Sequence, residues 1–92
     1  MIDVRQTGKG DPLEFEVTVR EGGGETRHRV TASRKYCDRL GGDAPEDRLI
    51  EAAFRFLLDR EPKEAILSRF DISVVARYFP EFEARLPDYL VS

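Results

Sequence analysis

Residues 13–20 alternate strictly between apolar and polar side chains, and this pattern constrains the fold more than any other part of the chain. The apolar set is Leu13, Phe15, Val17 and Val19. A period of two places one set on each face of a β-strand, so one face is buried and the other meets solvent. Residues 25–33 repeat the period with His28, Val30 and Ala32 inward. We therefore expect two neighbouring antiparallel strands.

A triple glycine at 22–24 separates the two segments, and glycine accepts the positive φ that tight hairpin turns require. The charges on the outer face select the register. A two-residue turn at Gly22-Gly23 sets Arg20 opposite Glu25, whereas a four-residue loop would set Arg20 opposite Arg27. Opposite charges across a strand pair stabilise it by ~0.2–1 kcal/mol and like charges destabilise it. The sequence therefore predicts the two-residue turn.

The rest of the chain reads as short strands and helices separated by glycine and proline. In chain order we expect a strand at 2–6, a helix at 34–40 capped by Ser33, a long helix at 45–60, helices at 63–70 and 72–79, and a last turn that Pro80 begins and Pro87 ends. Strands followed by helices predict an α+β fold: an N-terminal antiparallel β-hairpin or three-stranded meander, then three to four helices packed on one sheet face. We expect a single domain over 1–92, strand-rich over 1–33 and helical over 34–92.

The long helix at 45–60 carries apolar residues around roughly 240° of its circumference, at 100° per residue. The polar residues form a narrow stripe, which consists of Arg48, Glu51, Arg55 and Asp59. So wide an apolar arc is typical of a central helix with neighbours on several sides, or of a helix that keeps part of its surface for a partner.

The net charge and the cysteine content limit which partners and which cellular compartment we expect for this protein. The net charge is −3, which does not favour nucleic acid or an anionic membrane surface. Cys37 is the only cysteine, so the fold needs no internal disulfide, as is usual in a reducing cytoplasm. The sequence shows neither a signal-peptide pattern at its start nor an apolar run long enough to span a bilayer. We therefore expect a cytoplasmic protein with no membrane partner.

The residues that usually carry catalysis do not form a recognisable set. His28 and Cys37 are the single histidine and the single cysteine, and a zinc site needs three or four such ligands. Basic residues near Cys37 could lower the pKa of its thiol, although a buried thiol is the simpler interpretation. Glu14 and Glu16 face solvent on one strand, where pairing with Arg29 explains them. We predict no catalytic residue, no metal ligand and no cofactor, and an enzyme is the least favoured class.

One local charge bias offers a candidate anion or nucleic-acid site. The basic residues of the 27–39 patch fall within thirteen positions and are Arg27, Arg29, Arg34, Lys35 and Arg39. A cluster of this kind can bind a phosphate backbone. The alternative is that Glu14, Glu16 and Glu25 across the hairpin neutralise it.

Residues 62–80 have the spacing of a helix-turn-helix and are a second candidate for nucleic-acid binding. Residues 71–80 read Asp-Ile-Ser-Val-Val-Ala-Arg-Tyr-Phe-Pro. This stretch resembles the recognition helix of tetracycline-repressor-like regulators, which ends in Tyr-Phe-Pro or His-Phe-Pro. The resemblance implies DNA reading through Ser73 and Arg77. The chain departs from the pattern because Asp71 stands where a turn glycine is usual and because the helix is two residues short.

Three further segments, at 50–62, 66–73 and 78–82, together resemble small bacterial proteins of similar length whose function is not known. That resemblance implies a free-standing bacterial domain and supplies no activity or site residue. The sequence leaves three classes of function open. A protein-interaction or regulatory module, with another protein or a second copy as partner, is favoured over a nucleic-acid binder, and both are favoured over a small enzyme.

Overall fold

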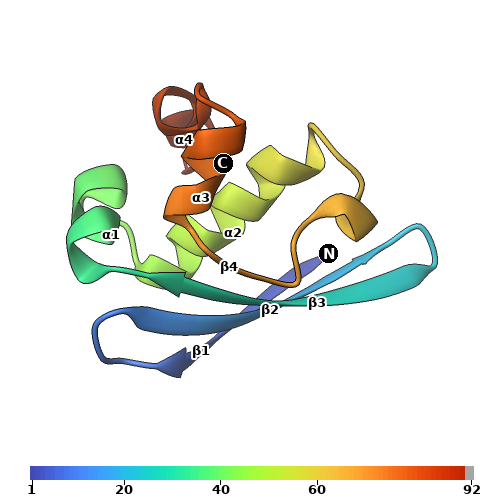
Figure 1. Ribbon diagram of the computed structural model, residues 1–92, viewed down its shortest axis with the longest axis horizontal. Coiled ribbons are helices and arrows are strands. Elements are labelled where there is room, and N and C mark those ends of the chain that lie inside the picture. Colours follow the sequence, from blue (N-terminus) through green and yellow to red (C-terminus); the bar gives the residue numbers. More distant parts are fainter. Residues whose placement is uncertain (91–92) are drawn as a thin grey trace.

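A computed structural model describes residues 1–90 of the chain, with four strands, four α-helices and one 3₁₀ turn. The strands are β1 (Ile2–Gly8), β2 (Leu13–Glu21), β3 (Gly24–Ala32) and β4 (Arg69–Asp71). The helices are α1 (Arg34–Gly41), α2 (Glu46–Leu58), α3 (Ser73–Tyr78) and α4 (Phe82–Leu90), and the 3₁₀ turn η1 is Lys63–Ala65. The helices all lie on one face of the sheet (Figure 1), which confirms the α+β fold.

The hairpin between β2 and β3 has the register that the charges predicted. Arg20 is the partner of Glu25, and their side chains form an ion pair of 3.0 Å. Gly22 and Gly23 occupy the turn with φ of 63° and 81°, so both central residues need the positive φ that glycine accepts. The side chains of β2 that alternate inward are almost completely buried, from Leu13 to Val19.

Strand β1 adds to the other side of β2 and completes the three-stranded meander, so the expected strand at 2–6 is confirmed and runs on to Gly8. Ile2 pairs with Val19 and Val4 with Val17, in antiparallel register. The sheet order is β1-β2-β3-β4, which leaves β1 and β4 at opposite edges.

The expected helix at 63–70 is wrong. Only Lys63–Ala65 form a 3₁₀ turn, and Arg69–Asp71 form strand β4, which runs parallel to β3. The side-chain hydroxyl of Thr31 donates to Asp71 at 2.6 Å across this pair. The apolar residues at 66, 67 and 70 have helical spacing, but the backbone is extended because β3 offers a free edge that no local pattern reveals.

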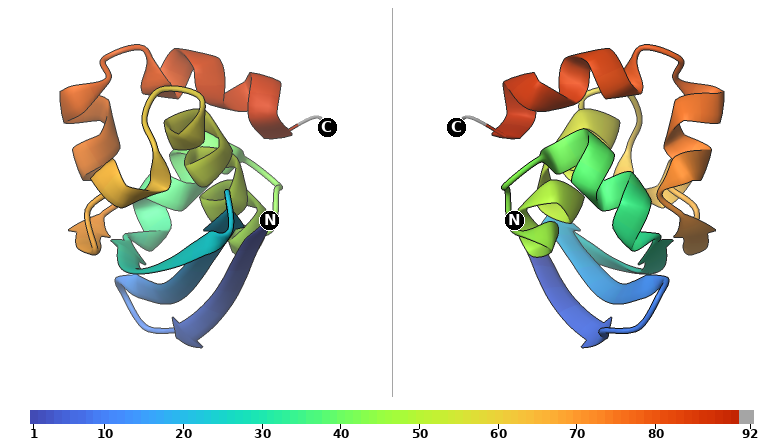
Figure 2. Two further views of the ribbon diagram at one scale, coloured as in Figure 1. Left: turned by 90° about the vertical axis from the view of Figure 1, so that its right-hand side faces the viewer. Right: turned by 90° about the vertical axis from the view of Figure 1, so that its left-hand side faces the viewer.

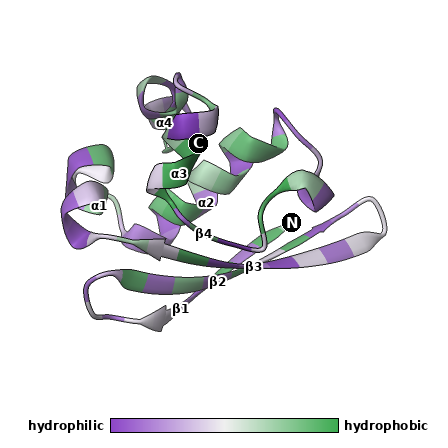
Figure 3. Ribbon diagram, in the orientation of Figure 1, coloured by the Kyte–Doolittle hydropathy of each residue, from purple (hydrophilic) through white to green (hydrophobic). Residues whose placement is uncertain are grey.

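Helix α2 lies across the sheet and is the centre of the core (Figure 2). Its buried residues point in nearly every direction and are Leu49, Ile50, Ala52, Ala53, Phe54, Phe56 and Leu57. Hydropathy colouring shows the same concentration of apolar residues on α2 and on the segment that leads into β4 (Figure 3). The wide apolar arc of α2 is therefore largely covered by the protein's own sheet and helices.

The remaining helices close the layer above α2. Ser33 caps α1 as expected, with its hydroxyl accepting from the backbone N–H of Tyr36 at 3.0 Å. The Tyr36 hydroxyl also donates to Glu83 at 2.8 Å, which joins α1 to α4. Pro87 does not end the last helix, because it lies inside α4. Proline costs that helix one backbone hydrogen bond, and burial of Leu86 against the core offsets the loss.

The shifted pKa of the Asp71 carboxylate indicates how the free energy of unfolding should depend on pH at acidic values. Burial raises its pKa, but hydrogen bonds from Ser73 and Thr31 outweigh burial and hold the pKa below its ordinary value. Its stabilising effect is therefore complete above about pH 5, well above the unfolded-state pKa, and is lost as pH falls through the folded-state pKa. We expect Asp71→Asn to flatten the acid loss of unfolding free energy, measured by urea unfolding at a series of pH values.

The matched control for this prediction is Asp88→Asn, since the Asp88 side chain is 66% exposed and lies 3.8 Å from its nearest basic partner. If the free energy of unfolding falls equally steeply towards acidic pH in wild type and in Asp71→Asn, the role given to Asp71 is wrong.

Candidate functional site: an apolar groove beside strand β4

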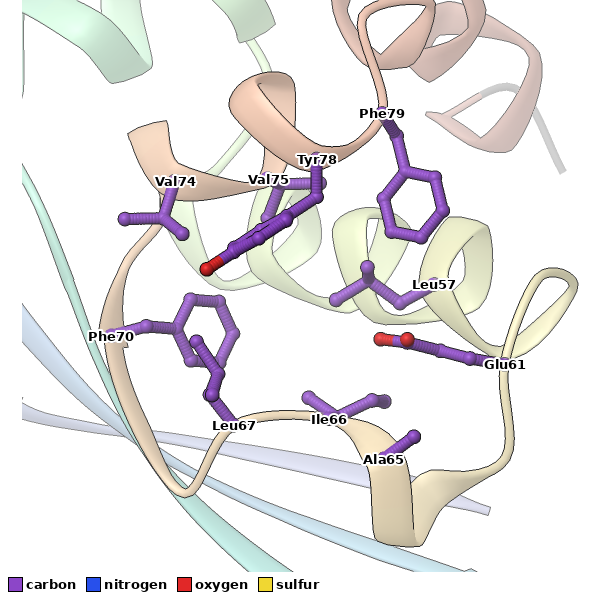
Figure 4. Close-up of a pocket in the computed structure, with 10 residues that line it drawn as sticks. All are labelled: Leu57, Glu61, Ala65, Ile66, Leu67, Phe70, Val74, Val75, Tyr78 and Phe79. Carbon is purple, nitrogen blue, oxygen red and sulfur yellow. The ribbon is translucent and has the colours of Figure 1, made fainter.

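An open cavity of about 440 Å³ lies between η1, β4 and α3, on the helical side of the sheet. Figure 4 shows the side chains that line it. We call it the apolar groove, and its lining residues are Leu57, Glu61, Ala65, Ile66, Leu67, Phe70, Val74, Val75, Tyr78 and Phe79. The floor comes from α2 through Leu57, and the two walls come from the segment at 65–70 and from α3.

Two large side chains on the walls of the apolar groove are strongly exposed. Leu67 is 48% exposed and Tyr78 is 69% exposed, and Met1 is the only other large apolar residue of 1–90 with comparable exposure. Exposed apolar side chains that gather around a concave surface mark a site of interaction more often than scattered ones do. The apolar groove is therefore the strongest candidate site on the described part of the chain.

Glu61 is the one charged residue among those that line the apolar groove. Its side chain points into the cavity beneath Leu57 (Figure 4). None of the ion pairs within residues 1–90 includes Glu61. A single carboxylate in an apolar setting favours an occupant that carries one positive charge beside its apolar part.

His28 fixes the wall that Leu67 forms. Its ring lies 2.7 Å from the Leu67 carbonyl oxygen through Nδ1 and 2.8 Å from the Thr26 hydroxyl through Nε2. A carbonyl oxygen can only accept, so Nδ1 carries the hydrogen and, in the neutral ring, Nε2 accepts from Thr26. The ring is 2% exposed and packs on Phe54 with centroids 5.3 Å apart. His28 is thus a structural residue that positions the groove wall.

Cys37 is not an activated thiol. It is 5% exposed, and burial raises the pKa of its thiol to about 11, with Glu46 and Asp38 adding to the effect. The suggestion that nearby basic residues lower this pKa is therefore wrong, because the acids and the apolar core dominate. A thiol with such a pKa is almost fully protonated at neutral pH and is a poor nucleophile.

Three of the candidate basic residues are engaged within the fold. Arg27 forms an ion pair with Glu25 at 3.2 Å, and Arg39 forms one with Glu83 at 3.0 Å. Arg34 donates to backbone carbonyls of the loop before β2, at Gly10 with 3.2 Å and at Lys9. These contacts hold α1 and the hairpin in place.

Arg29 differs, because it stands beside a basic residue that the sequence did not single out. On the open face of the sheet Arg29 is the strand partner of Arg69 in β4, and within residues 1–90 neither forms an ion pair. Glu16, expected to neutralise Arg29, instead pairs with Arg5 at 2.9 Å. Arg27, Arg29 and Arg69 line one shallow depression together with Glu16. Of the 27–39 patch, only Arg27 and Arg29 therefore lie together in this depression.

The other two candidates lie apart from this depression. Lys35 lies on α1 and Arg77 on α3, both exposed and both without an ion-pair partner in the described part of the chain. The segment at 62–80 holds a 3₁₀ turn, a strand and one short helix, so the first helix of a helix-turn-helix is absent from it. Ser73, expected on a reading face, hydrogen-bonds Asp71 at 2.6 Å.

Within residues 1–90, no group of three or more His, Cys, Asp or Glu side chains is placed to hold a metal ion. No helix in this range has the length and apolar character needed to cross a bilayer.

The apolar groove cannot be interpreted through relatives. Comparisons with known protein families, with curated proteins and with solved structures each found no match.

Proposed function

We propose that this protein is a small cytoplasmic interaction module whose apolar groove binds an amphipathic helical segment of another protein. The observation that carries the proposal is the exposure of Leu67 and Tyr78 on the walls of a cavity whose lining is otherwise apolar. Helix-in-groove recognition uses a row of apolar side chains at helical spacing that enters such a surface. The buried, protonated thiol of Cys37 is consistent with a reducing compartment.

The shape of the apolar groove favours a peptide over a small molecule. Small-molecule pockets fall in the range of roughly 300–1,000 Å³ but enclose most of the ligand surface. The apolar groove has a comparable volume, about 440 Å³, yet its walls leave Leu67 48% exposed and Tyr78 69% exposed. A partner that extends beyond the cavity would cover these walls, and a ligand confined to the cavity would not.

Glu61 sets the charge expected of the partner. A lysine or arginine at the edge of the partner's apolar face would reach this carboxylate while the apolar side chains enter the cavity. Charge complementarity at a rim governs the choice of partner more than the total affinity.

The proposal predicts the outcome of a selection from a displayed library of helical peptides. Peptides recovered on the wild-type protein should carry large apolar residues at i, i+3 or i+4, with a lysine or arginine beside them. They should bind Leu67→Ser/Tyr78→Ser at least ~10-fold more weakly, because each truncated wall residue removes apolar contact. Binding is measured by fluorescence anisotropy of the labelled peptide.

Two controls make this test specific. The charge reversal Glu61→Lys should shift the selected peptides from basic to acidic residues at the same position. The variant Lys35→Ser, on the exposed surface of α1, should leave binding unchanged. If the selected peptides bind the double variant as tightly as the wild type, the apolar groove is not the interaction site.

The adjacent pair Arg29 and Arg69 supports a second candidate function, the binding of a phosphate backbone on the open sheet face. This alternative requires that a labelled duplex or single-stranded RNA bind at low salt. It also requires that Arg29→Ala/Arg69→Ala abolish the binding while Leu67→Ser/Tyr78→Ser leaves it intact. The net charge of −3 makes the alternative weaker than the peptide-binding proposal.

A further inference from the structure

Strand β1 presents an open edge of the sheet that no other strand of residues 1–90 covers. It is seven residues long and has β2 on one side only. The other edge of the sheet is the three-residue β4, and Figure 2 shows β1 as the outermost strand on its own side. A long free edge is a template for pairing with a further strand, and folded proteins usually cover or disrupt it.

The hydrogen-bond pattern identifies the groups that face this open edge. Met1 and Arg20 exchange both of their backbone hydrogen bonds, at 2.8 and 2.6 Å. In an antiparallel ladder such pairs recur at every second residue, so the backbones of Asp3 and Arg5 also face β2. The N–H and C=O groups of Ile2, Val4 and Gln6 therefore point away from the sheet.

We infer that β1 pairs with β1 of a second copy of this chain, antiparallel and centred on Val4. In this register Val4 faces Val4 of the second copy, and Ile2 faces Gln6. All three residues present outward backbone groups, so each facing pair can form two hydrogen bonds across the two-fold axis. Two four-stranded sheets become one continuous sheet of eight strands.

Charge selects this register over its neighbours. Centring on Val4 places Asp3 opposite Arg5 of the second copy, twice, on the open face of the sheet. Centring on Asp3 or on Arg5 would place like charges opposite each other, which destabilises a strand pair. Centring on Ile2 gives Asp3 and Arg5 no opposite charge across the axis, and centring on Gln6 places Asp3 opposite Lys9, which lies beyond the end of β1 at Gly8. The edge is thus self-complementary in one register.

Apolar burial supports the same arrangement. Ile2 and Val4 pack against the core from β1 but remain partly exposed at the sheet edge. Pairing at Val4 brings the two Val4 side chains together on the helical side of the sheet and places each Ile2 opposite Gln6 of the other copy. The apolar groove lies beside β4, at the opposite edge, so this inference involves a different surface from the proposed function.

The test is the association state of the whole chain across a concentration series, measured by sedimentation velocity. We expect a reversible monomer–dimer equilibrium that Val4→Pro shifts to monomer by at least ~10-fold in the dissociation constant. Proline at this position removes only an N–H that faces the open edge, so the β1–β2 ladder keeps its hydrogen bonds. Circular dichroism verifies that the variant is folded.

A second variant and a site-resolved readout make the test independent of the proline. Asp3→Lys should weaken the dimer by a similar factor, because it places like charges across the axis. The amides of Ile2, Val4 and Gln6 should become protected from hydrogen exchange as concentration rises, while Leu67→Ser/Tyr78→Ser leaves the equilibrium unchanged. A chain that stays monomeric, or a dimer that both edge variants leave intact, would overturn the inference.

Discussion

Truncating Phe54 to alanine should cost about 3–5 kcal/mol of unfolding free energy, the range typical of a fully buried phenylalanine. Phe54 is 0% exposed and packs from α2 against side chains of β3 and β4. Its ring centroid is 5.3 Å from that of His28 and 6.0 Å from that of Phe70. Removing the ring therefore leaves a cavity that three elements share, and a domain of this size has a total stability of only about 5–15 kcal/mol.

Urea unfolding followed by circular dichroism measures this effect. The matched control is Leu67→Ala, which truncates a side chain that is 48% exposed and should change the free energy by less than about 0.5 kcal/mol. If Phe54→Ala unfolds within that same margin of wild type, α2 is not the central helix of the core.

Replacing His28 with leucine should cost about 2–4 kcal/mol, although leucine is apolar and the site is buried. The substitution leaves the Leu67 carbonyl and the Thr26 hydroxyl without the imidazole that each now contacts. A buried polar group that loses its partner costs about 1–3 kcal/mol. The loss also frees the wall of the apolar groove, so peptide binding should weaken together with stability.

His28→Asn separates the hydrogen bond from the ring. Its side-chain amide can donate to the Leu67 carbonyl from a position close to that of Nδ1, so it should recover part of the lost stability and part of the peptide affinity. The measurement is the same urea unfolding, paired with anisotropy of the selected peptide. Equal losses for the leucine and asparagine variants would show that packing on Phe54, and not the Leu67 contact, determines the effect.

The sequence predicts those parts of the fold that local physics determines. Alternation buries Leu13 to Val19, and the charge on Arg20 selects the register with Glu25, because each depends on residues close in the chain. Strand β4 has no such signal. Three residues are too few to show a period of two, and Phe70 is extended because it pairs with Val30, forty residues earlier in the sequence.

The candidate site follows the same rule. The wide apolar arc of the long helix predicts either a central helix or a face kept for a partner. The structure shows the first, because tertiary contacts cover α2 and the exposed apolar residues lie on its neighbours. Leu67 and Tyr78 belong to segments whose packing depends on β4. A sequence prediction that misses this strand therefore also misses the apolar groove. Each lies next to a more buried apolar residue, Ile66 or Phe79, so the local pattern does not distinguish the exposed side chain from its more buried neighbour.

The parallel pairing of β4 also has a consequence for the order of folding. Strands β1, β2 and β3 meet through short turns, whereas Thr31 and Asp71 come together across forty residues of chain. Closing so long a loop costs entropy that only the finished core repays, so we expect β4 to dock late, after α2 has covered the meander. The wall of the apolar groove then assembles later than the meander. A partner that binds the apolar groove stabilises the state in which β4 is docked. Binding of the partner and docking of β4 are therefore thermodynamically linked.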